Sequence, residues 1–221
     1  MVTQQNYSKA KNEVLVSEKR ARIIDAASKL FSQKGYHRTT MRNISEESGI
    51  ELSYLYKFIS SKDDILFLFH EHVHSKYAPL YKMIESSKGE DPAVLMKNIL
   101  VMILRILRQI PSEILTMYSE SRHLEKSSLK IVLQKETQMI TIIEDLVKRG
   151  IECGKFKVND SFFAANIIQY LITIECIRGW SFKKNYSSKS IEDSIINFIM
   201  AGLGSGRKIV SNREANLQSN P

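Results

Sequence analysis

The stretch from Gly35 to Leu66, GYHRTTMRNISEESGIELSYLYKFISSKDDIL, constrains the fold of this chain more than any other part of it. It predicts two short helices joined by a tight turn, because Thr39 or Thr40 can cap the first helix and Gly49 allows a positive φ between the two. Three aliphatic side chains can then pack against one another: Ile44, Ile50 and Leu55. The predicted arrangement is a helix-turn-helix.

The segment before this stretch, SEKRARIIDAASKLFSQKG, predicts a third helix against which the two short ones pack. Ser17 can cap its start, and Gly35 suits the left-handed position at which a helix ends. Apolar residues recur between them at helical spacing: Ile23, Ile24, Ala27, Leu30 and Phe31. The three helices form a small head, which we expect over residues 17–63.

Side chains of the kind that bind nucleic acid crowd the second short helix, which we expect over residues 51–58. A helix that enters the major groove needs short polar side chains at its start, with hydroxyls and cations nearby for the phosphates. The residues that meet this description are Thr40, Arg42, Ser53, Tyr54, Tyr56, Lys57 and Lys62. Taken singly, each has the alternative of an ordinary solvated surface position, but their joint spacing favours a DNA-binding head.

The charge of the chain is a weaker argument for DNA than this pattern. The net charge of +8 fits a polyanionic partner. Residues 1–75, however, hold 11 Lys and Arg against 9 Asp and Glu, which is a net charge of only +2. The motif must therefore carry the interpretation.

The run TTMRNISEESGIELSYLYKFISSKDDIL resembles the DNA-binding signature of TetR/AcrR-type transcriptional regulators, as does the helix before it. The matching positions are Thr40, Ile44, Gly49-Ile50, Leu55-Tyr56 and the run from Ser61 to Leu66. The resemblance covers residues 18 to about 70. It implies phosphate contacts from Thr40, Tyr56, Lys57 and Lys62, and base or groove contacts from Leu52, Ser53 and Tyr54.

Three residues depart from the family pattern. Glu51 stands where Ser or Thr commonly caps the recognition helix, Ser53 where Gly is usual, and Ile59 where Phe is usual. Glu51 brings an acid near the DNA, where it could accept a hydrogen bond from a cytosine amino group or point away. These departures leave the operator sequence open. Glu51 is also the one feature that favours an adaptor whose head no longer binds DNA.

Beyond Leu66 the sequence predicts helices and no strands, so the expected fold class is all-α. The expected helices cover residues 62–77, 91–109, 112–122, 127–153, 160–182 and 190–203. Pro79 is expected to end or kink the first of them. The predicted organisation is a flexible arm over residues 1–16, the head, a larger helical domain over residues 64–204 and a disordered tail over residues 205–221.

The family resemblance implies that this larger domain binds a small effector and dimerises through its last two long helices. The predicted dimer contacts are Ile174, Ile191, Ile195 and Ile199, with burial inside one subunit as the alternative. The candidate effector-binding residues are Tyr118, Arg122, Phe163, Ile167 and Arg178. Arg122 or Arg178 could neutralise an anionic head group while apolar side chains line a tail pocket, with a solvated helix face as the alternative for either arginine. The run from Tyr118 to His123 resembles runs in family members that respond to fatty acyl thioesters, and this resemblance implies such an effector.

Three histidines, His70, His72 and His74, invite comparison with a metal site, because His70 and His74 are four residues apart on one helical face. No matching Cys or Asp cluster accompanies them, so we expect no metal. Cys153 and Cys176 lie far apart and are expected to be reduced thiols.

The function predicted for the chain is that of a ligand-responsive, dimeric transcriptional regulator. It is expected to be a repressor that a small apolar or amphipathic effector releases from a palindromic operator. The alternative is an α-helical enzyme or an adaptor with a DNA-binding-like head. No GxSxG motif or nucleotide-binding glycine loop supports an enzyme, and we expect no cofactor. With no export signal and no run of 18 apolar residues, we expect a cytoplasmic protein without a membrane partner.

Overall fold

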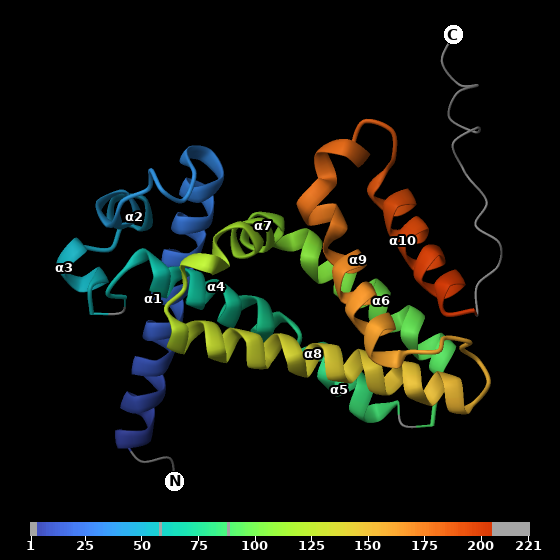
Figure 1. Ribbon diagram of the computed structural model, residues 1–221. Helices are drawn as coiled ribbons and strands as arrows, with labels where there is room; N and C mark the ends of the chain where they lie inside the picture. The colour runs from blue at the N-terminus through green and yellow to red at the C-terminus, as the bar shows by residue number, and fades with distance from the viewer. Residues whose placement is uncertain (1–3, 58, 88, 205–221) are drawn as a thin grey trace. The chain divides into compact units, whose positions relative to one another are not determined.

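The computed structural model describes residues 4–57, 59–87 and 89–204, with the backbone alone given for residues 4–15 and for His123. Within these residues the structure contains helices and no strands, so the predicted all-α fold is confirmed (Figure 1). The chain divides into two compact units. Unit 1 holds Met1–Lys76 and Ile110–Lys135, and unit 2 holds Tyr77–Gln109 and Glu136–Pro221. The predicted tail over residues 205–221 lies outside the described residues.

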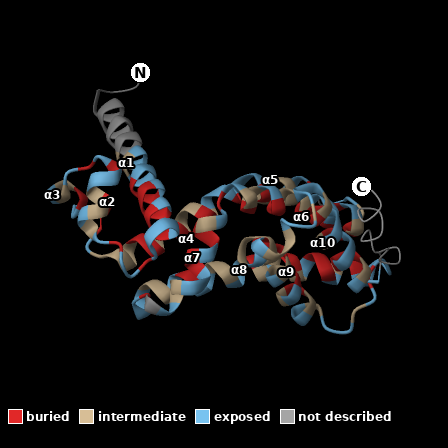
Figure 2. Cartoon of the chain, turned by 90° about the horizontal axis from the view of Figure 1, so that it is seen from above, coloured by how far each residue is buried: buried red, intermediate tan, exposed pale blue. Residues whose placement is uncertain are grey.

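Unit 1 is built on its long first helix. Its helices are α1 (Gln4–Lys34), α2 (Met41–Ser48), α3 (Leu52–Leu55), α4 (Lys62–Lys76), α7 (Pro111–Glu120), the 3₁₀ turn η1 (Ser121–His123) and the start of α8 (Lys126–Glu152). α2 packs on α1, and α4 packs on both α1 and α7. The buried core between them includes Ile23, Ala27, Phe31, Ile44, Leu55, Ile65, Leu66 and Phe69 (Figure 2). The Phe31 ring meets the rings of Tyr36 and Phe69 edge-on, with centroids 4.9 and 5.8 Å away.

The start of α1 corrects the predicted organisation. The helix begins at Gln4, well before Ser17, so the expected flexible arm is wrong from Gln4 onward. Residues 1–3 lie outside the described part of the chain. The arm was inferred from a missing apolar period, but residues 4–16 contain no Gly or Pro. A helix extends through such residues at little cost once its packed part has formed.

Unit 2 is built around a buried helix. Its helices are α5 (Ala78–Ser86), α6 (Pro92–Gln109), the remainder of α8, α9 (Ser161–Phe182) and α10 (Ser188–Gly202). α6 packs against α5, α9 and α10, and its most deeply buried side chains are Leu95, Met96, Leu100, Ile103 and Leu104. The guanidinium of Arg108 donates to Glu175 at 3.0 Å, to Glu192 at 2.8 Å and to the carbonyl of Ser188. It therefore joins the end of α6 to α9 and α10.

Several helix boundaries differ from those predicted. α5 was not predicted, because Pro79 was expected to end or kink the preceding helix. In the structure Pro79 lies in the first turn of α5, where its missing N–H costs no hydrogen bond. α9 has non-helical backbone angles at Arg178, with φ −121° and ψ 19°. The two compact units also do not divide at residue 63, because α4 packs with the head helices in unit 1.

Candidate nucleic-acid interface

The first short helix of the head begins with a reciprocal capping arrangement. The Thr40 hydroxyl accepts from the Asn43 N–H at 3.2 Å, and the Thr40 N–H donates to Asn43 Oδ1 at 3.1 Å. Thr40 and Arg42 are both exposed at this end of α2. A helix N-terminus presents N–H groups and a positive partial charge, so this end of α2 together with the Arg42 guanidinium can hold a phosphate.

The turn between α2 and α3 is locked by hydrogen bonds and by one glycine. Gly49 has φ +62°, and a Cβ at this position would lie 2.9 Å from Nη2 of Arg22. The same Arg22 atom donates to the carbonyl of Ser48 at 2.5 Å, and the Ser45 hydroxyl donates to the carbonyl of Ile50 at 2.6 Å. The predicted positive φ at Gly49 is confirmed.

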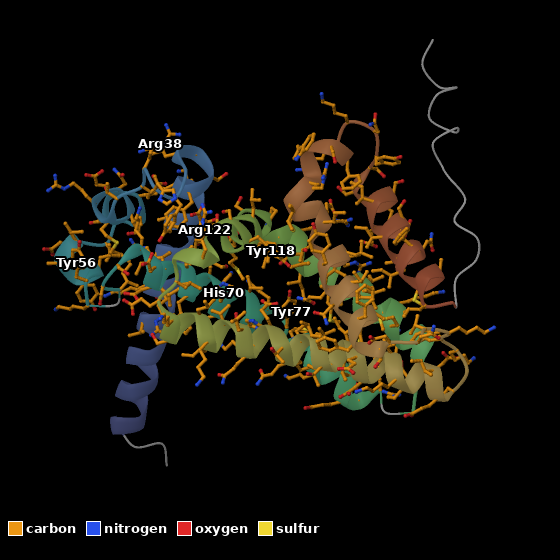
Figure 3. All side chains as sticks on the ribbon, viewed as in Figure 1. Arg38, Tyr56, His70, Tyr77, Tyr118 and Arg122 are labelled. Carbon is orange, nitrogen blue, oxygen red and sulfur yellow. The ribbon has the colours of Figure 1, made fainter. Side chains whose placement is uncertain are left out.

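The second short helix of the head, α3, is shorter than the predicted recognition helix. It covers Leu52–Leu55 rather than residues 51–58, and Phe58 lies outside the described residues. Leu55 is fully buried and anchors the helix, as do the buried Ile50 and Ile59 on either side. The exposed side chains around it are Ser53, Tyr56 and Lys57, and Leu52 and Tyr54 are half-buried (Tyr56 is labelled in Figure 3).

Glu51 occupies the position before α3 but does not cap the helix with its side chain. Its carboxylate instead accepts a hydrogen bond of 2.7 Å from the hydroxyl of Ser53. The two residues that depart from the family pattern on this surface are therefore partners of each other. This pairing orients the acid along the start of α3.

Tyr54 lies close to two cations. The ammonium of Lys19, on α1, is 3.8 Å from the centroid of the Tyr54 ring, and the ammonium of Lys57 is 5.1 Å from it. Lys19 was not among the residues predicted for this surface. A sequence offers little sign of such a contact, because Lys19 lies 35 positions before Tyr54.

Lys62 takes part in a different contact from the one predicted. Its ammonium donates to the backbone carbonyls of Tyr36 at 2.9 Å and His37 at 3.3 Å, and lies 4.6 Å from the centroid of the Tyr36 ring. Burial lowers the pKa of Lys62. The Tyr36 hydroxyl donates to Asp63 at 2.5 Å, and burial, together with this carboxylate, raises the pKa of Tyr36. Lys62 thus ties α4 to the loop before α2.

The candidate effector-binding residues are divided between the two units. Tyr118 on α7 and Arg122 on η1 belong to unit 1, and both are exposed. Phe163 and Ile167 belong to unit 2, where they line a shared pocket. Arg178 is also in unit 2, but it lies outside that pocket, with its guanidinium 5.6 Å from the ring of Trp180.

The pocket in unit 2 is an apolar hollow between α9 and α10, with a volume of about 460 Å³. Its apolar lining is Phe163, Ile167, Ile168, Leu171, Phe198, Ile199 and Leu203. Polar side chains are confined to the segment that leads into α9: Lys157, Asn159 and Asp160. Asp160 is the N-cap of α9, since its carboxylate accepts from the Phe163 N–H at 2.8 Å.

The structure revises the predicted dimer contacts. Ile191 and Ile199 are buried in the core of unit 2, so they cannot supply an exposed face of α10. Ile174 and Ile195 are half-buried. The large apolar side chains left exposed on these two helices are instead Phe162, Phe163, Ile167, Tyr170, Trp180 and Phe198. The sequence indicates these exposed apolar side chains, because α9 carries apolar residues on nearly all sides and one unit cannot bury all of them.

His70 lies in the core of unit 1 with only 4% of its surface exposed. Neither ring nitrogen has a hydrogen-bond partner among the described residues. Burial, with lesser contributions from His74 and Lys135, lowers its pKa to about 4. Among the described residues, no group of three or more His, Cys, Asp or Glu is arranged to hold a metal ion. Within the same residues, no helix combines the length and apolar character needed to cross a membrane.

The comparisons with known proteins agree with this geometry. Residues 23–68 match the family described as "Bacterial regulatory proteins, tetR family". A stretch of 63 residues is 44% identical to the HTH-type transcriptional regulator HbdR of Aromatoleum sp. strain CIB, and it covers 28% of each chain. The chain thus matches little more than a quarter of that relative's length.

Solved structures show a likeness over most of the chain. A tetR-family regulator from Rhodococcus RHA1 has a TM-score of 0.74 at 17% identity, over 84% of this chain and 96% of that one. AibR in complex with isovaleryl coenzyme A and operator DNA has a TM-score of 0.69 at 16% identity, over 81% and 97%. FadR from Bacillus subtilis in complex with stearoyl-CoA has a TM-score of 0.67 at 19% identity, over 82% and 98%. These likenesses show the fold.

An all-helical chain with a capped α2, a glycine-locked turn and a short α3 falls in the class of helix-turn-helix proteins. Within that class, residues 23–68 match the tetR family of bacterial regulatory proteins, so this part of the chain is a TetR-type head. The resemblance to TetR-type transcriptional regulators is therefore confirmed over this segment.

Proposed function

We propose that this chain is a ligand-responsive transcriptional regulator whose head binds operator DNA. The observation that carries the proposal is the exposure of Ser53, Tyr56 and Lys57 around α3, next to the capped start of α2. α3 would enter the major groove, with Leu52, Ser53 and Tyr54 nearest the bases. Thr40, Arg42, Tyr56 and Lys57 would hold phosphates on either side. A regulator of this kind acts in the cytoplasm, where the chromosome is.

We also propose that the chain acts as a homodimer. Phe163, Ile167, Tyr170 and Ile174 follow one another at intervals of four, three and four residues, so they form one stripe along α9. Ile195 and Phe198 are three residues apart on α10, and Phe198 shares the pocket with Phe163 and Ile167. An exposed apolar face of this extent is typical of a protein interface. We therefore assign Phe163 and Ile167 to the dimer face rather than to the effector site.

A dimer explains how a small head could select one site in a genome. One recognition helix contacts only a few base pairs, and a single head would discriminate poorly. Two heads related by a two-fold axis read two half-sites, so the operator is expected to be a palindrome or close to one.

The effector we propose is an amphipathic molecule such as a fatty acyl thioester, which would release a repressor from its operator. Support comes from AibR and FadR, two structures of the same fold that hold isovaleryl coenzyme A and stearoyl-CoA respectively. In unit 1, Tyr118 and Arg122 are the candidates for contacts with the polar head group, and in unit 2 the alternative candidate is Arg178. The ligand would have to favour a conformation whose heads no longer fit the operator.

The test is a competition experiment on duplexes from the region upstream of the protein's own gene. We expect a complex that survives an excess of unrelated DNA and dissociates when a long-chain acyl-CoA is added. Equal affinity for related and unrelated duplexes would show that the head is not a specific DNA reader, as the adaptor alternative requires. Release by a polar metabolite or a metal ion, and not by any acyl-CoA, would remove the effector assignment while leaving the DNA-binding assignment in place.

A further inference from the structure

Three basic side chains on α1 contact the helix-turn-helix. Lys19, Arg22 and Lys29 are spaced by three and seven residues, so they lie on one side of α1. The ammonium of Lys29 contacts Glu47, near the end of α2, at 2.5 Å. The guanidinium of Arg22 donates to the carbonyl of Ser48 at 2.5 Å, at the turn. Lys19, the third member, reaches Tyr54 on α3.

α3 needs support of this kind more than the other helices of the head. It has only four residues, and the side chain of Glu51 makes no capping bond at its start. A helix of that length has little stability of its own. The fully buried Leu55 fixes where α3 sits. Tyr54, the neighbouring residue, is half-buried, so contacts to its ring help to set the orientation of the side chain.

The ammonium of Lys19 provides such a contact, at 3.8 Å from the centroid of the Tyr54 ring. A cation at this distance is attracted by the negative charge on the face of an aromatic ring. Lys57 lies farther away, at 5.1 Å, and its position next to the predicted phosphate contacts means that DNA would compete for it. Lys19 comes from the packed helix α1 and would keep its contact with the ring while Lys57 turns to a phosphate.

We propose that Lys19 is a positioning residue for DNA recognition: it holds the ring of Tyr54 ready for the bases and makes no phosphate contact of its own. The proposal rests on the proposed DNA-binding function. It assigns Lys19 to sequence selectivity and Lys57 to general affinity for the DNA backbone.

The experiment compares Lys19→Met, which keeps the length of the side chain and removes the charge, with Lys19→Arg, which keeps a cation. Arg20→Met, on the next residue of α1 and exposed, is the matched control for loss of a positive charge. Affinity is measured at several salt concentrations, for the operator and for an unrelated duplex. Thermal melting first establishes that all variants fold.

We expect Lys19→Met to lower the ratio of operator affinity to nonspecific affinity by about 3- to 10-fold, the range that a cation–π contact of ordinary strength supports. Its salt dependence should stay that of the wild type. Lys19→Arg should restore the ratio, and Arg20→Met should leave it unchanged. In a Tyr54→Leu background, Lys19→Met should have no further effect, because the ring it positions is gone.

Two results would overturn the positioning role. One is a fall of about 1 in the salt slope of Lys19→Met that persists in the Tyr54→Leu background, which would make Lys19 a phosphate contact. The other is an unchanged affinity ratio. An NMR measurement without DNA separates this proposal from the proposed function, since the methylene protons of Lys19 next to the ring should be shifted upfield and should lose that shift in Tyr54→Leu. If the shift is present but the wild-type protein selects no DNA, the proposed function fails and the contact is structural only.

Discussion

Two lysines that look equivalent in the motif have different roles in the structure. Lys57 is exposed beside α3, whereas the ammonium of Lys62 is held by the carbonyls of Tyr36 and His37. A lysine with its hydrogen bonds already made inside the protein must break them to reach a phosphate. Lys62 is therefore the weakest member of the predicted phosphate set, and Lys57 is a strong one.

The first prediction separates these two roles. Lys57→Ala should weaken binding to all duplexes alike and lower the salt slope by about 1, because one phosphate contact is lost. Lys62→Ala should instead lower the melting temperature, since it removes the tie between α4 and the loop before α2. The measurements are DNA affinity against salt concentration and thermal melting. Unchanged affinity and slope for Lys57→Ala would show that the assigned docking is wrong.

The second prediction concerns His70. Leaving a buried polar group without a partner costs about 1–3 kcal/mol, so His70→Leu should stabilise the protein by an amount of this order at pH 7. Urea unfolding of the two proteins measures it. A less stable variant would show that the imidazole has a hydrogen-bonding role that the neighbouring side chains do not account for.

His70 should also make stability depend on pH. Its pKa falls from an ordinary 6.5 to about 4 in the folded protein, so between these values the unfolded chain binds more protons. The neutral His70 therefore leaves the free energy of unfolding unchanged above pH 6.5. As the pH falls from 6.5 toward 4, protonation of the unfolded chain lowers that free energy by roughly 3 kcal/mol in all. The groups that face it are His74, whose own pKa is lowered by burial, and Lys135. The difference between wild type and His70→Leu should therefore widen on acidification over this window.

At the scale of the elements, α8 carries a close contact that its sequence does not show. Gly150 lies in the helix against the buried Phe156, and a Cβ at this position would be 2.0 Å from the Phe156 ring. The glycine is needed because the chain turns back after α8 and packs Phe156 on the helix itself. Phe156 and Lys155 both donate their N–H groups to the carbonyl of Gly150, at 2.9 and 2.8 Å.

The third prediction follows from that contact. Gly150→Ala should destabilise the protein by about 1–3 kcal/mol through overpacking, although alanine is the better helix former. Gly202→Ala on α10 is the matched control, because no atom lies within 4 Å of its added Cβ. It should be neutral or stabilising. Equal melting temperatures for the two variants would mean that Phe156 moves aside at no cost.

At the scale of the whole molecule, the exposed apolar stripe on α9 bears on assembly. Ile167 has 43% of its surface exposed in the single chain, and its neighbours in the pocket, Phe163 and Phe198, are more exposed still. Because these side chains are not needed for the core of unit 2, a charge placed among them tests association without removing a core residue. This was not true of Ile191 or Ile199, which are buried.

The fourth prediction is that Ile167→Asp converts a dimer to a folded monomer at micromolar concentration. An unpaired charge in the interface would be desolvated without compensation. Val94→Asp is the control, since Val94 is an aliphatic residue of α6 with 52% exposure and is not among the residues that line the pocket. Sedimentation should show a dimer for the control and a monomer for the variant. A dimer in both cases would place the interface elsewhere.

The sequence by itself determined the features that depend on neighbouring residues. Thr40 and Asn43 cap α2 because their groups meet within one helical turn, and Gly49 takes a positive φ because it lacks a Cβ. Apolar spacing was enough to predict the all-α fold and most helices beyond the head. Local propensity also extends α1 to Gln4, where the lack of an apolar period by itself predicts a flexible arm.

Only the tertiary structure decided which residues far apart in the chain contact one another. Periodicity could show that Ile191 and Ile199 lie on one side of α10, but not whether that side packs inside unit 2 or against a second copy. Lys62 and Lys19 are both cations near the DNA motif, yet one binds backbone carbonyls and the other lies over Tyr54. Such assignments depend on distances between separate helices, and packing sets those distances.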